Sequence, residues 1–232
     1  VLEEISFYDE KESCYSGITV NEAKNSNKIK TASVFARVGL TLYREINSVV
    51  QWSLIPTYPE YENYRITQDL DFKLLSYATE VNIGRLDGNG YTFRNIDLTN
   101  ANFIGQINSA LVDINFEDVT INSNVTTNVG LVEVCNGKIS DCNFKDITIN
   151  HTYKSTGTLS EIGIISRQNG GTIENVNLER VTVKIAAGKA NYVGGLIGYY
   201  YGVGKVHNVN AIDVNVKGVT YVGGLIGCTH IA

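Results

Sequence analysis

The sequence repeats itself from Phe93 onward, and this repetition constrains the fold more than any other feature. Five segments align: FRNIDL from Phe93, LVDINFEDVTI from Leu111, ISDCNFKDITI from Ile139, IENVNLERVTV from Ile173 and VHNVNAIDVNV from Val206. Positions 1, 4, 6, 9 and 11 of the unit are apolar, whereas positions 3, 5 and 10 hold Asp, Asn or Thr. Apolar residues two apart are typical of a half-buried strand. One unit cannot bury its apolar side alone, but stacked units can.

The spacing of the units predicts a parallel β-helix. Their first residues lie 18, 28, 34 and 33 positions apart, which leaves room for a strand, a bend at positions 7 and 8, a second strand and a loop. Parallel crossovers favour right-handed winding. We therefore expect an all-β protein whose main part is a right-handed parallel β-helix of about five coils. Its first inward column would contain Phe93, Leu111, Ile139, Ile173 and Val206.

Position 5 is predicted to form a polar ladder. It is occupied by Asn115, Asn143, Asn177 and Asn210. Stacked amides can hydrogen-bond from one layer to the next, and Asn also bonds the backbone at bends, so we interpret the ladder as structural. Cys142 falls in inward position 4, where a small buried hydrophobe is expected.

A glycine signature follows each unit: NFIG at 102–105, VGLV at 129–132, IGII at 162–165, and YVGGLIG at 192–198 and again at 221–227. Glycine permits a positive φ angle and lets two backbones approach closely. The signature therefore predicts a tight corner of the coil, with the following apolar residues refilling the core.

The chain is expected to divide into residues 1–60 and residues 61–232. The first part shows no repeat and is predicted to be a small β domain, with strands in SVFARVGLTLYREI and VVQWSLI and a linker in IPTYPEYENY, which holds both prolines. In the second part, YRITQDLDF and EVNIGRLDGNGYTF would supply the first strands and cap the β-helix. A cap is expected because an open end exposes unpaired backbone groups.

Composition argues against several functions. The net charge is −5 and no Lys/Arg cluster occurs, so nucleic acid is not an expected partner. No apolar run approaches the roughly 20 residues of a spanning helix, so no membrane span is expected in this fragment. The first residue is Val rather than Met, which favours a segment cut from a larger parent chain.

No sequence motif indicates catalysis, a metal or a cofactor. HExxH and CxxC are both absent, and the three His residues lie far apart. Asp69 and Asp71 share a strand face and could act as an acid/base pair, but no cationic partner is nearby in the sequence. Asp87-Gly88-Asn89-Gly90 is interpreted as a turn rather than a calcium loop, because Tyr91 stands at a ligand position and Asn-Gly favours a hairpin turn.

These stretches resemble the GLUG-motif region of Gram-positive bacterial surface proteins. The resemblance rests on YRITQDLDF, LDGNGYTFRNI and the two YVGGLIG stretches, and it covers roughly residues 64–232. Proteins with this pattern are large adhesins and secreted zinc endopeptidases of the immunoglobulin-A-protease type, in which the repeats precede the protease domain. LTLYRE and SLIPTYPEYENYRI are also similar to the stretch ahead of such repeats. VGLV and IGII depart from the pattern by losing a Gly. The resemblance implies an extracellular location at the bacterial cell surface.

One feature exceeds what a scaffold needs. Tyr192 and Tyr221 hold equivalent places in successive units, and Tyr199, Tyr200 and Tyr201 follow the first GLIG. Because a strand cannot bury three consecutive rings, these tyrosines are candidates for binding a host protein or a glycan. The alternative is that they are ordinary half-buried strand residues, since Tyr has a high β propensity. The hypothesis is a non-catalytic binding and spacing segment of an adhesin-like protein, secreted or attached to the cell wall. The alternatives are an accessory region that positions substrate for an immunoglobulin-A-protease-type zinc endopeptidase, and a β-helix polysaccharide lyase or hydrolase.

Overall fold

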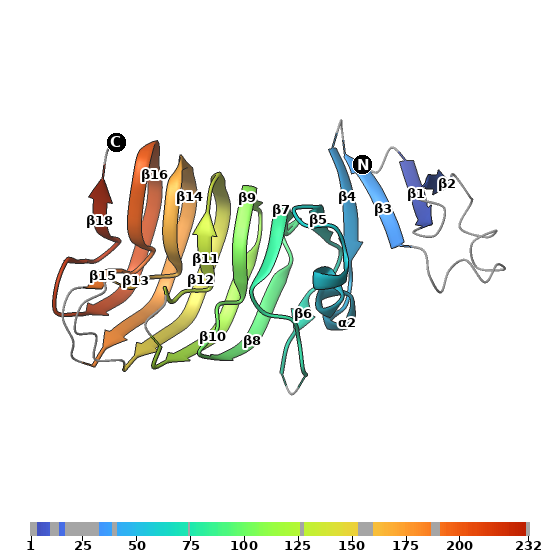
Figure 1. The fold of residues 1–232 in the computed structure, drawn as a ribbon. Helices are drawn as coiled ribbons and strands as arrows, with labels where there is room; N and C mark the ends of the chain where they lie inside the picture. Colours follow the sequence, from blue (N-terminus) through green and yellow to red (C-terminus); the bar gives the residue numbers. More distant parts are fainter. Residues whose placement is uncertain are drawn as a thin grey trace.

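The computed structural model is an all-β protein whose strands stack side by side along one long axis (Figure 1). It describes residues 4–9, 14–16, 33–38, 41–73, 75–125, 128–152, 160–186 and 191–230. The elements are β1 (Glu4–Asp9), β2 (Cys14–Ser16), β3 (Ser33–Val38), β4 (Thr41–Ile46), α2 (Val49–Ser53), η2 (Ile55–Thr57), β5 (Asn63–Ile66), β6 (Leu70–Asp71), β7 (Val81–Asp87), β8 (Thr92–Thr99), β9 (Ile104–Val112), β10 (Asn115–Ser123), β11 (Val132–Cys135), β12 (Lys138–His151), β13 (Ser160–Ile162), β14 (Ile165–Ile185), β15 (Asn191–Gly194), β16 (Ile197–Lys217), β17 (Val222–Gly223) and β18 (Ile226–His230).

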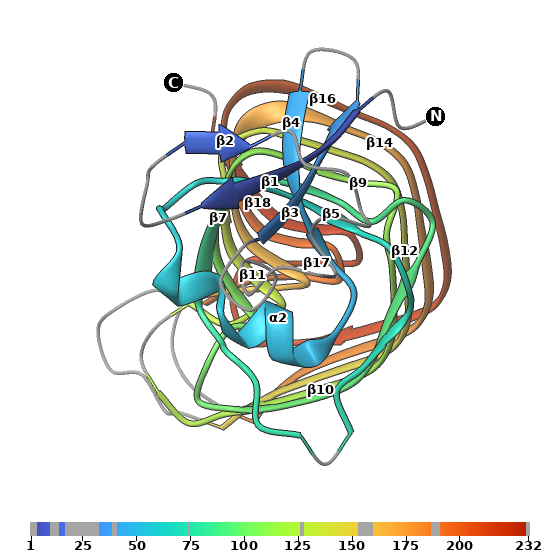
Figure 2. The same cartoon turned by 90° about the vertical axis from the view of Figure 1, so that its right-hand side faces the viewer.

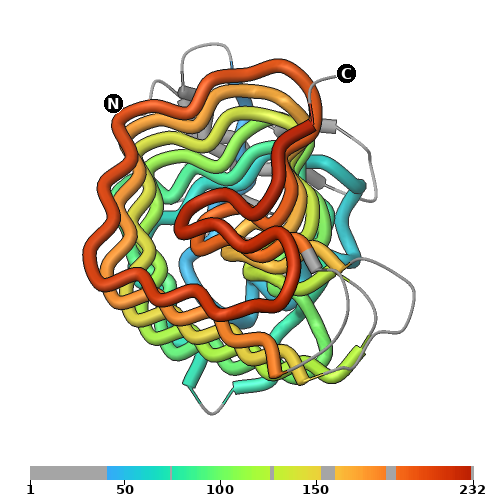
Figure 3. The backbone as a smooth tube through the Cα atoms, turned by 90° about the vertical axis from the view of Figure 1, so that its left-hand side faces the viewer, coloured from blue at the N-terminus to red at the C-terminus, as the bar shows by residue number. Residues whose placement is uncertain are grey.

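Successive passes of the chain lie on one another in parallel register, and we call each pass a layer. In one column Leu86 pairs with Leu111, Leu111 with Ile139, Ile139 with Ile173 and Ile173 with Val206. Viewed along the axis, the passes superimpose around a common interior (Figure 3). Like residues therefore stack on like residues, as the repeat predicted.

The first aligned unit was wrongly placed. Phe93 pairs with Phe116 at position 6 of the unit, and Leu86 occupies the position 1 predicted for Phe93. The physical reason is a repeat within the unit: positions 1, 4 and 6 have the same spacing as positions 6, 9 and 11. Phe93, Ile96 and Leu98 can therefore be aligned either to positions 1, 4 and 6 or to positions 6, 9 and 11. The structure has the second alignment, with Asn89 and Gly90 as two extra residues between Leu86 and Phe93.

Two columns of single residues with positive φ make the chain bend. The first holds Asp113, Asp141, Asn175 and Asn208, with φ between 51° and 57°. The second holds Asn95, Asp118, Asp146, Arg180 and Asp213, with φ between 53° and 58°. Asp and Asn tolerate the left-handed region better than other L residues. Each bend takes one residue, so strand pairing continues through it and β12, β14 and β16 become long bent strands.

The interior is filled by the apolar columns. Phe116 and Phe144 are fully buried, and their rings stack 5.6 Å apart with an angle of 2° between the planes. Cys142 is also fully buried, as predicted, and burial raises the pKa of its thiol to about 12. The core is continuous from the layer of Tyr64 to that of Ile197.

The end of the molecule near β5 is closed by a helix, in a segment that was predicted to be a strand of the small β domain. The stretches expected to cap this end, YRITQDLDF and EVNIGRLDGNGYTF, instead contribute β5 to β8, which pair within the stack. VVQWSLI forms α2 and η2, which lie across the interior in the end-on view (Figure 2). Ser48 caps α2 by accepting a hydrogen bond from the Gln51 N–H at 3.3 Å. Trp52 is fully buried, stacks on Phe103 at 4.7 Å and donates its indole N–H to the Ala78 carbonyl at 3.0 Å. The β-branched residues are compatible with a strand, but the Ser48 N-cap and apolar side chains three apart favour a helix.

Strand pairing runs across the expected division between residues 60 and 61. β1, β3 and β4 are antiparallel, so SVFARVGLTLYREI forms the two strands β3 and β4 rather than the single strand expected, and β4 then pairs in parallel with β5. Arg44 of β4 is buried, pairs with Glu62 at 2.7 Å and lies 3.5 Å from the centre of the Tyr58 ring. The segment expected as a linker is thus packed against β4, while the division into two domains stays a prediction.

Candidate binding site: a tyrosine strip at a glycine corner

The candidate site is built on a corner where two sheets approach each other closely. β13, β15 and β17 form a small sheet, and the chain then crosses into the large sheet at β14, β16 and β18. A Cβ atom on Gly198 would lie 2.4 Å from the Ile162 backbone nitrogen, and one on Gly194 would lie 2.0 Å from the Ile197 carbonyl oxygen. Glycine is required here because any side chain would force the two backbones apart.

Positive φ does not explain these glycines, contrary to the prediction. Among the described residues, the glycines with positive φ are Gly90, Gly170, Gly171 and Gly202, and none lies in a YVGGLIG stretch. Close backbone approach, the other predicted reason, is what the structure shows. Its consequence is that side chains on the outer faces of the two sheets meet across the corner.

Aromatic side chains gather on the outer side of this corner in the last two layers, although Cys228 of the last layer is in register with Tyr199. Tyr192 of β15 stacks on Tyr199 of β16 at 4.9 Å with 26° between planes, and Tyr221 of the next layer lies 5.0 Å from Tyr192. Tyr199 neighbours Tyr201 at 6.4 Å, and Tyr201 stacks on His230 of β18 at 5.5 Å and 3°. We call Tyr192, Tyr199, Tyr201, Tyr221 and His230 the tyrosine strip.

Tyr200 does not belong to the strip, although it was predicted with the other tyrosines. Strand alternation turns it inward, its side chain is 6% exposed, and its hydroxyl donates to the Gly171 carbonyl at 2.9 Å. The prediction that three consecutive rings cannot all be buried holds, since Tyr201 is 42% exposed.

One layer earlier, an ion pair crosses the same corner. Glu161 is in register with Tyr192, and Arg167 is in register with Tyr199. The Arg167 guanidinium donates from Nε to Glu161 at 2.8 Å and makes a second contact through Nη2. The Glu161 side chain is only 5% exposed. The Arg167 guanidinium carbon also lies 5.6 Å from the centre of the Tyr199 ring, so the ion pair of the preceding layer packs against the strip.

The electrostatic surroundings of the strip are negative. Burial raises the pKa of Glu133, and the nearby carboxylates of Glu80 and Glu161 raise it further. Burial also raises the pKa of the Tyr192 and Tyr199 hydroxyls, which therefore stay neutral near pH 7 and can donate hydrogen bonds. The carboxylates of Glu161 and Glu133 both act on the Arg167 guanidinium, and that of Glu80 acts on Glu133.

Tyr221 is held in an unfavourable backbone conformation. Its φ is 49°, and its side chain is 55% exposed. A left-handed conformation costs an L residue with a Cβ roughly 1–2 kcal/mol. Apart from its ring contact with Tyr192, the side chain buries little in return, which fits a role outside folding.

The sequence indicated the tyrosines but not their polar neighbours. Glu161, Arg167, Glu133 and His230 carry no local motif. Counting residues from one glycine signature to the next would have found His230 and Arg167. Ile197 pairs with Ile226, so Tyr201 pairs with His230. Ile165 pairs with Ile197, so Arg167 pairs with Tyr199.

The predicted Asn ladder is hydrogen-bonded through three of its four residues. Asn143 donates to Asn115 at 2.6 Å and Asn177 donates to Asn143 at 2.7 Å, while Asn210 is in register with Asn177. A second ladder, which was not predicted, runs from Asn136 to Asn108 and from Asn169 to Asn136. These amides bond one another, as expected of structural ladders.

The other sequence candidates carry structural contacts. Asp69 accepts from Thr92 N–H and from Arg94, and Asp71 accepts from Lys73 N–H and from Asn95. Asp87 accepts from Asn89 N–H at 3.0 Å, and Asn89 and Gly90 have φ of 52° and 78°, as a hairpin-type turn requires. In the part of the chain that the structure describes, no three His, Cys, Asp or Glu side chains cluster as metal ligands.

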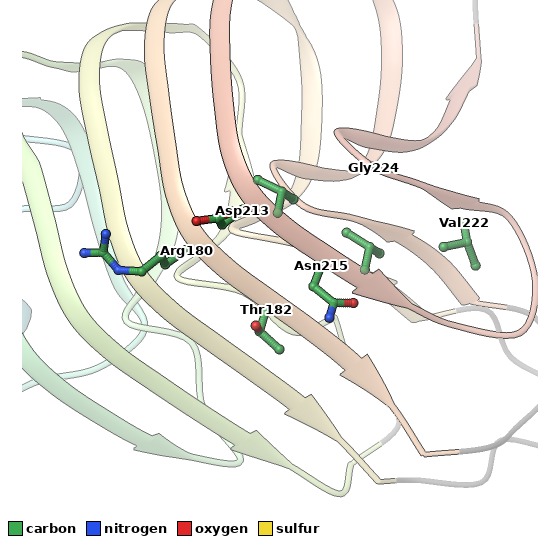
Figure 4. Close-up of a pocket in the computed structure, with 8 residues that line it drawn as sticks. Arg180, Thr182, Asp213, Asn215, Val222 and Gly224 are labelled. Atoms are coloured by element: carbon green, nitrogen blue, oxygen red, sulfur yellow. The ribbon is translucent and has the colours of Figure 1, made fainter.

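An open pocket of about 740 Å³ lies beside the last long strand (Figure 4). Its lining combines the polar residues Arg180, Thr182, Asp213 and Asn215 with Val214, Val216, Val222 and Gly224. Arg180 is already bound to Asp146, at 2.6 Å from Nε and 2.8 Å from Nη2. The pocket is where the interior meets solvent at the free edge of β16.

The chain matches no protein-family model, no curated protein and no solved structure at a significant level. None of the helices in the described ranges is both long and apolar enough to cross a membrane. The resemblance to GLUG-motif proteins therefore remains a hypothesis that rests on the quoted stretches alone.

Proposed function

We propose that this chain is a non-catalytic binding and spacing segment of a secreted or wall-attached bacterial surface protein. In this proposal the stacked layers form a right-handed parallel β-helix of about five coils, preceded by a small β domain. The observation that carries the proposal is the tyrosine strip. It places partly exposed aromatic rings on a rigid sheet, and such rings give contact area at a low loss of side-chain entropy.

The surroundings of the carboxylates support binding over catalysis. Asp69, Asp71 and Glu161 each accept hydrogen bonds or pair with Arg, so they hold the scaffold together. A polysaccharide lyase or hydrolase would instead need free acidic and basic groups converging on one point. An accessory region of an immunoglobulin-A-protease-type zinc endopeptidase is the second candidate, favoured by the similarity of SLIPTYPEYENYRI.

The experiment has two arms. The purified protein, incubated with a panel of peptide and polysaccharide substrates, is expected to release no product. In the second arm, immobilised host glycoproteins and a glycan array are probed for binding. Tyr192→Ala combined with Tyr221→Ala is expected to weaken any binding found, while the Tm stays within a few degrees of wild type.

Two results would overturn the proposal. One is metal-dependent or uronate-specific cleavage that persists after repurification. The other is binding that the double variant leaves unchanged. The zinc-endopeptidase candidate is distinguished by the parent gene, which would encode an HExxH domain after these repeats.

A further inference from the structure

The rings of the strip form a continuous stack that begins with a guanidinium. Arg167 lies over Tyr199, Tyr199 stacks on Tyr192, and Tyr192 contacts Tyr221. The faces of the inner rings are therefore covered by their neighbours. Tyr221, at the far end of the stack, is the most exposed tyrosine of the strip.

The molecule already places Arg against Tyr at two sites, each time beside a carboxylate. Arg44 lies 3.5 Å from the centre of the Tyr58 ring and pairs with Glu62. Arg167 lies 5.6 Å from the Tyr199 ring and pairs with Glu161. A guanidinium over an aromatic ring is attracted by the negative charge of the ring face. The free end of the stack at Tyr221 presents the same kind of ring without a cation over it in the described structure.

A second attractive point lies at the other end of the strip. Glu133 of β11 is half-buried and forms no ion pair with the described residues. Glu80 and Glu161 add negative potential there, which the Arg167 guanidinium partly offsets. Glu133 and Tyr221 are three layers apart, which corresponds to about 14 Å along the stacking axis at ~4.8 Å per layer. An extended peptide covers this distance in about four residues.

On the basis of the function proposed above, we propose that the strip docks a protein segment with two basic residues about four positions apart. One basic side chain stacks on Tyr221 and the other pairs with Glu133. Charge complementarity favours this partner over an anionic glycan, which the carboxylates would repel. A neutral glycan is less well matched, because sugar rings stack on open aromatic faces and most faces of the strip are covered.

The test uses a synthetic Gly/Ser decapeptide with Arg at positions 3 and 7, and fluorescence anisotropy with the whole chain. Binding is expected to weaken as NaCl is raised from low to high concentration. Tyr221→Ala is expected to weaken it about threefold, and Tyr221→Phe to leave it nearly unchanged, because Phe keeps the ring face that attracts the cation. Glu133→Gln is expected to weaken it about as much as Tyr221→Ala.

Three controls make the result specific. Glu60→Gln removes the same charge at an exposed position far from the strip and should have no effect. The same peptide with Glu at positions 3 and 7 should not bind. A neutral glucose hexasaccharide provides the competing ligand class.

Equal binding of the Arg and Glu peptides, or equal effects of Glu60→Gln and Glu133→Gln, would overturn the inference. The inference would also fail if the hexasaccharide bound, the Arg peptide did not, and Tyr221→Ala abolished the binding of the hexasaccharide. That result would leave the proposed binding function intact. If Tyr192→Ala with Tyr221→Ala changes the binding of no ligand, both proposals fail together.

Discussion

Single residues with positive φ determine the path of this chain. Asp and Asn occupy nearly all positions of the two bend columns, and Arg180 is the exception, with φ of 53°. Its guanidinium is held by both carboxylate oxygens of Asp146 in the preceding layer. At that bend, an ion pair between layers therefore compensates for the absence of Asp or Asn, which tolerate a positive φ better than Arg does.

Substitutions of Asp118 measure how much the residue at a bend contributes to the free energy of unfolding. Its φ is 56° and it is exposed, so Asp118→Ala is expected to reduce the free energy of unfolding by about 1 kcal/mol, whereas Asp118→Gly should be neutral or stabilising. Asp97→Ala, at an exposed position whose φ is not positive, is the control and should change stability little. Urea unfolding measures all three. Equal losses for both alanine variants would contradict the role of φ.

His151 makes stability depend on pH. It is fully buried, its Nε2 lies 2.9 Å from the Val125 carbonyl oxygen, and burial lowers its pKa below the usual value of about 6.5. Because the unfolded chain binds the proton more tightly, this stabilisation is present above pH ~6.5 and is lost as pH falls through the folded-state pKa.

The Tm is therefore expected to fall between pH 8 and pH 5, and His151→Gln should show a smaller fall. The difference in Tm between wild type and His151→Gln at pH 8, where His151 is neutral, measures the loss of packing alone. A variant with the same pH dependence as wild type would show that His151 does not titrate with unfolding.

Which residues form the site could be predicted only in part. The tyrosines were evident because aromatic residues in consecutive and equivalent positions stand out in the sequence. Tyr200 was assigned to the surface because alternation gives the period of a strand but not which phase faces inward. Glu161 and Arg167 meet across the corner where the backbone next to Glu161 approaches Gly198 so closely that a side chain there would clash.

At the scale of elements, the apolar columns and the Asn ladders stabilise the layers to different degrees. Phe144 is fully buried against Phe116, so Phe144→Ala should reduce the free energy of unfolding by about 3–5 kcal/mol. Asn143 bonds Asn115 and Asn177 but is exposed, so water can replace lost partners and Asn143→Ala should cost about 1 kcal/mol.

Denaturant titration measures both changes, and Phe144→Leu is the matched control, since Leu178 occupies the same column in the next layer. Leu should recover much of the loss. If Phe144→Ala and Asn143→Ala gave equal and negligible losses, the inward and outward columns would be wrongly assigned.

The elements could be predicted where a repeat supported them. The strands from Leu111 onward were placed correctly because four aligned copies, which start at Leu111, Ile139, Ile173 and Val206, are all apolar at positions 1, 4, 6, 9 and 11. Phe93 was misplaced because one unit contains two halves of equal spacing. α2 was missed because it occurs once, so no second copy draws attention to the Ser48 N-cap that begins it.

At the scale of the whole molecule, the two ends of the stack differ. One end is covered by α2, with Trp52 packed into the interior. At the other, β16 pairs with β14 along its length, but with β18 only over Ile197–Tyr201 among the described residues. Val206 and Ile212 are 37% and 52% exposed there.

This asymmetry predicts a gradient of hydrogen exchange. Amides in a parallel strand bond alternately to the two neighbouring strands. β12 lies between β10 and β14, so nearly all its amides should be protected. About half of the amides at residues 202–217 of β16 point away from β14 and should exchange at the rate of an unprotected chain. Protection of these amides as strong as that in β12 would contradict a free edge. Sedimentation velocity on the same sample would then reveal whether a second copy covers it.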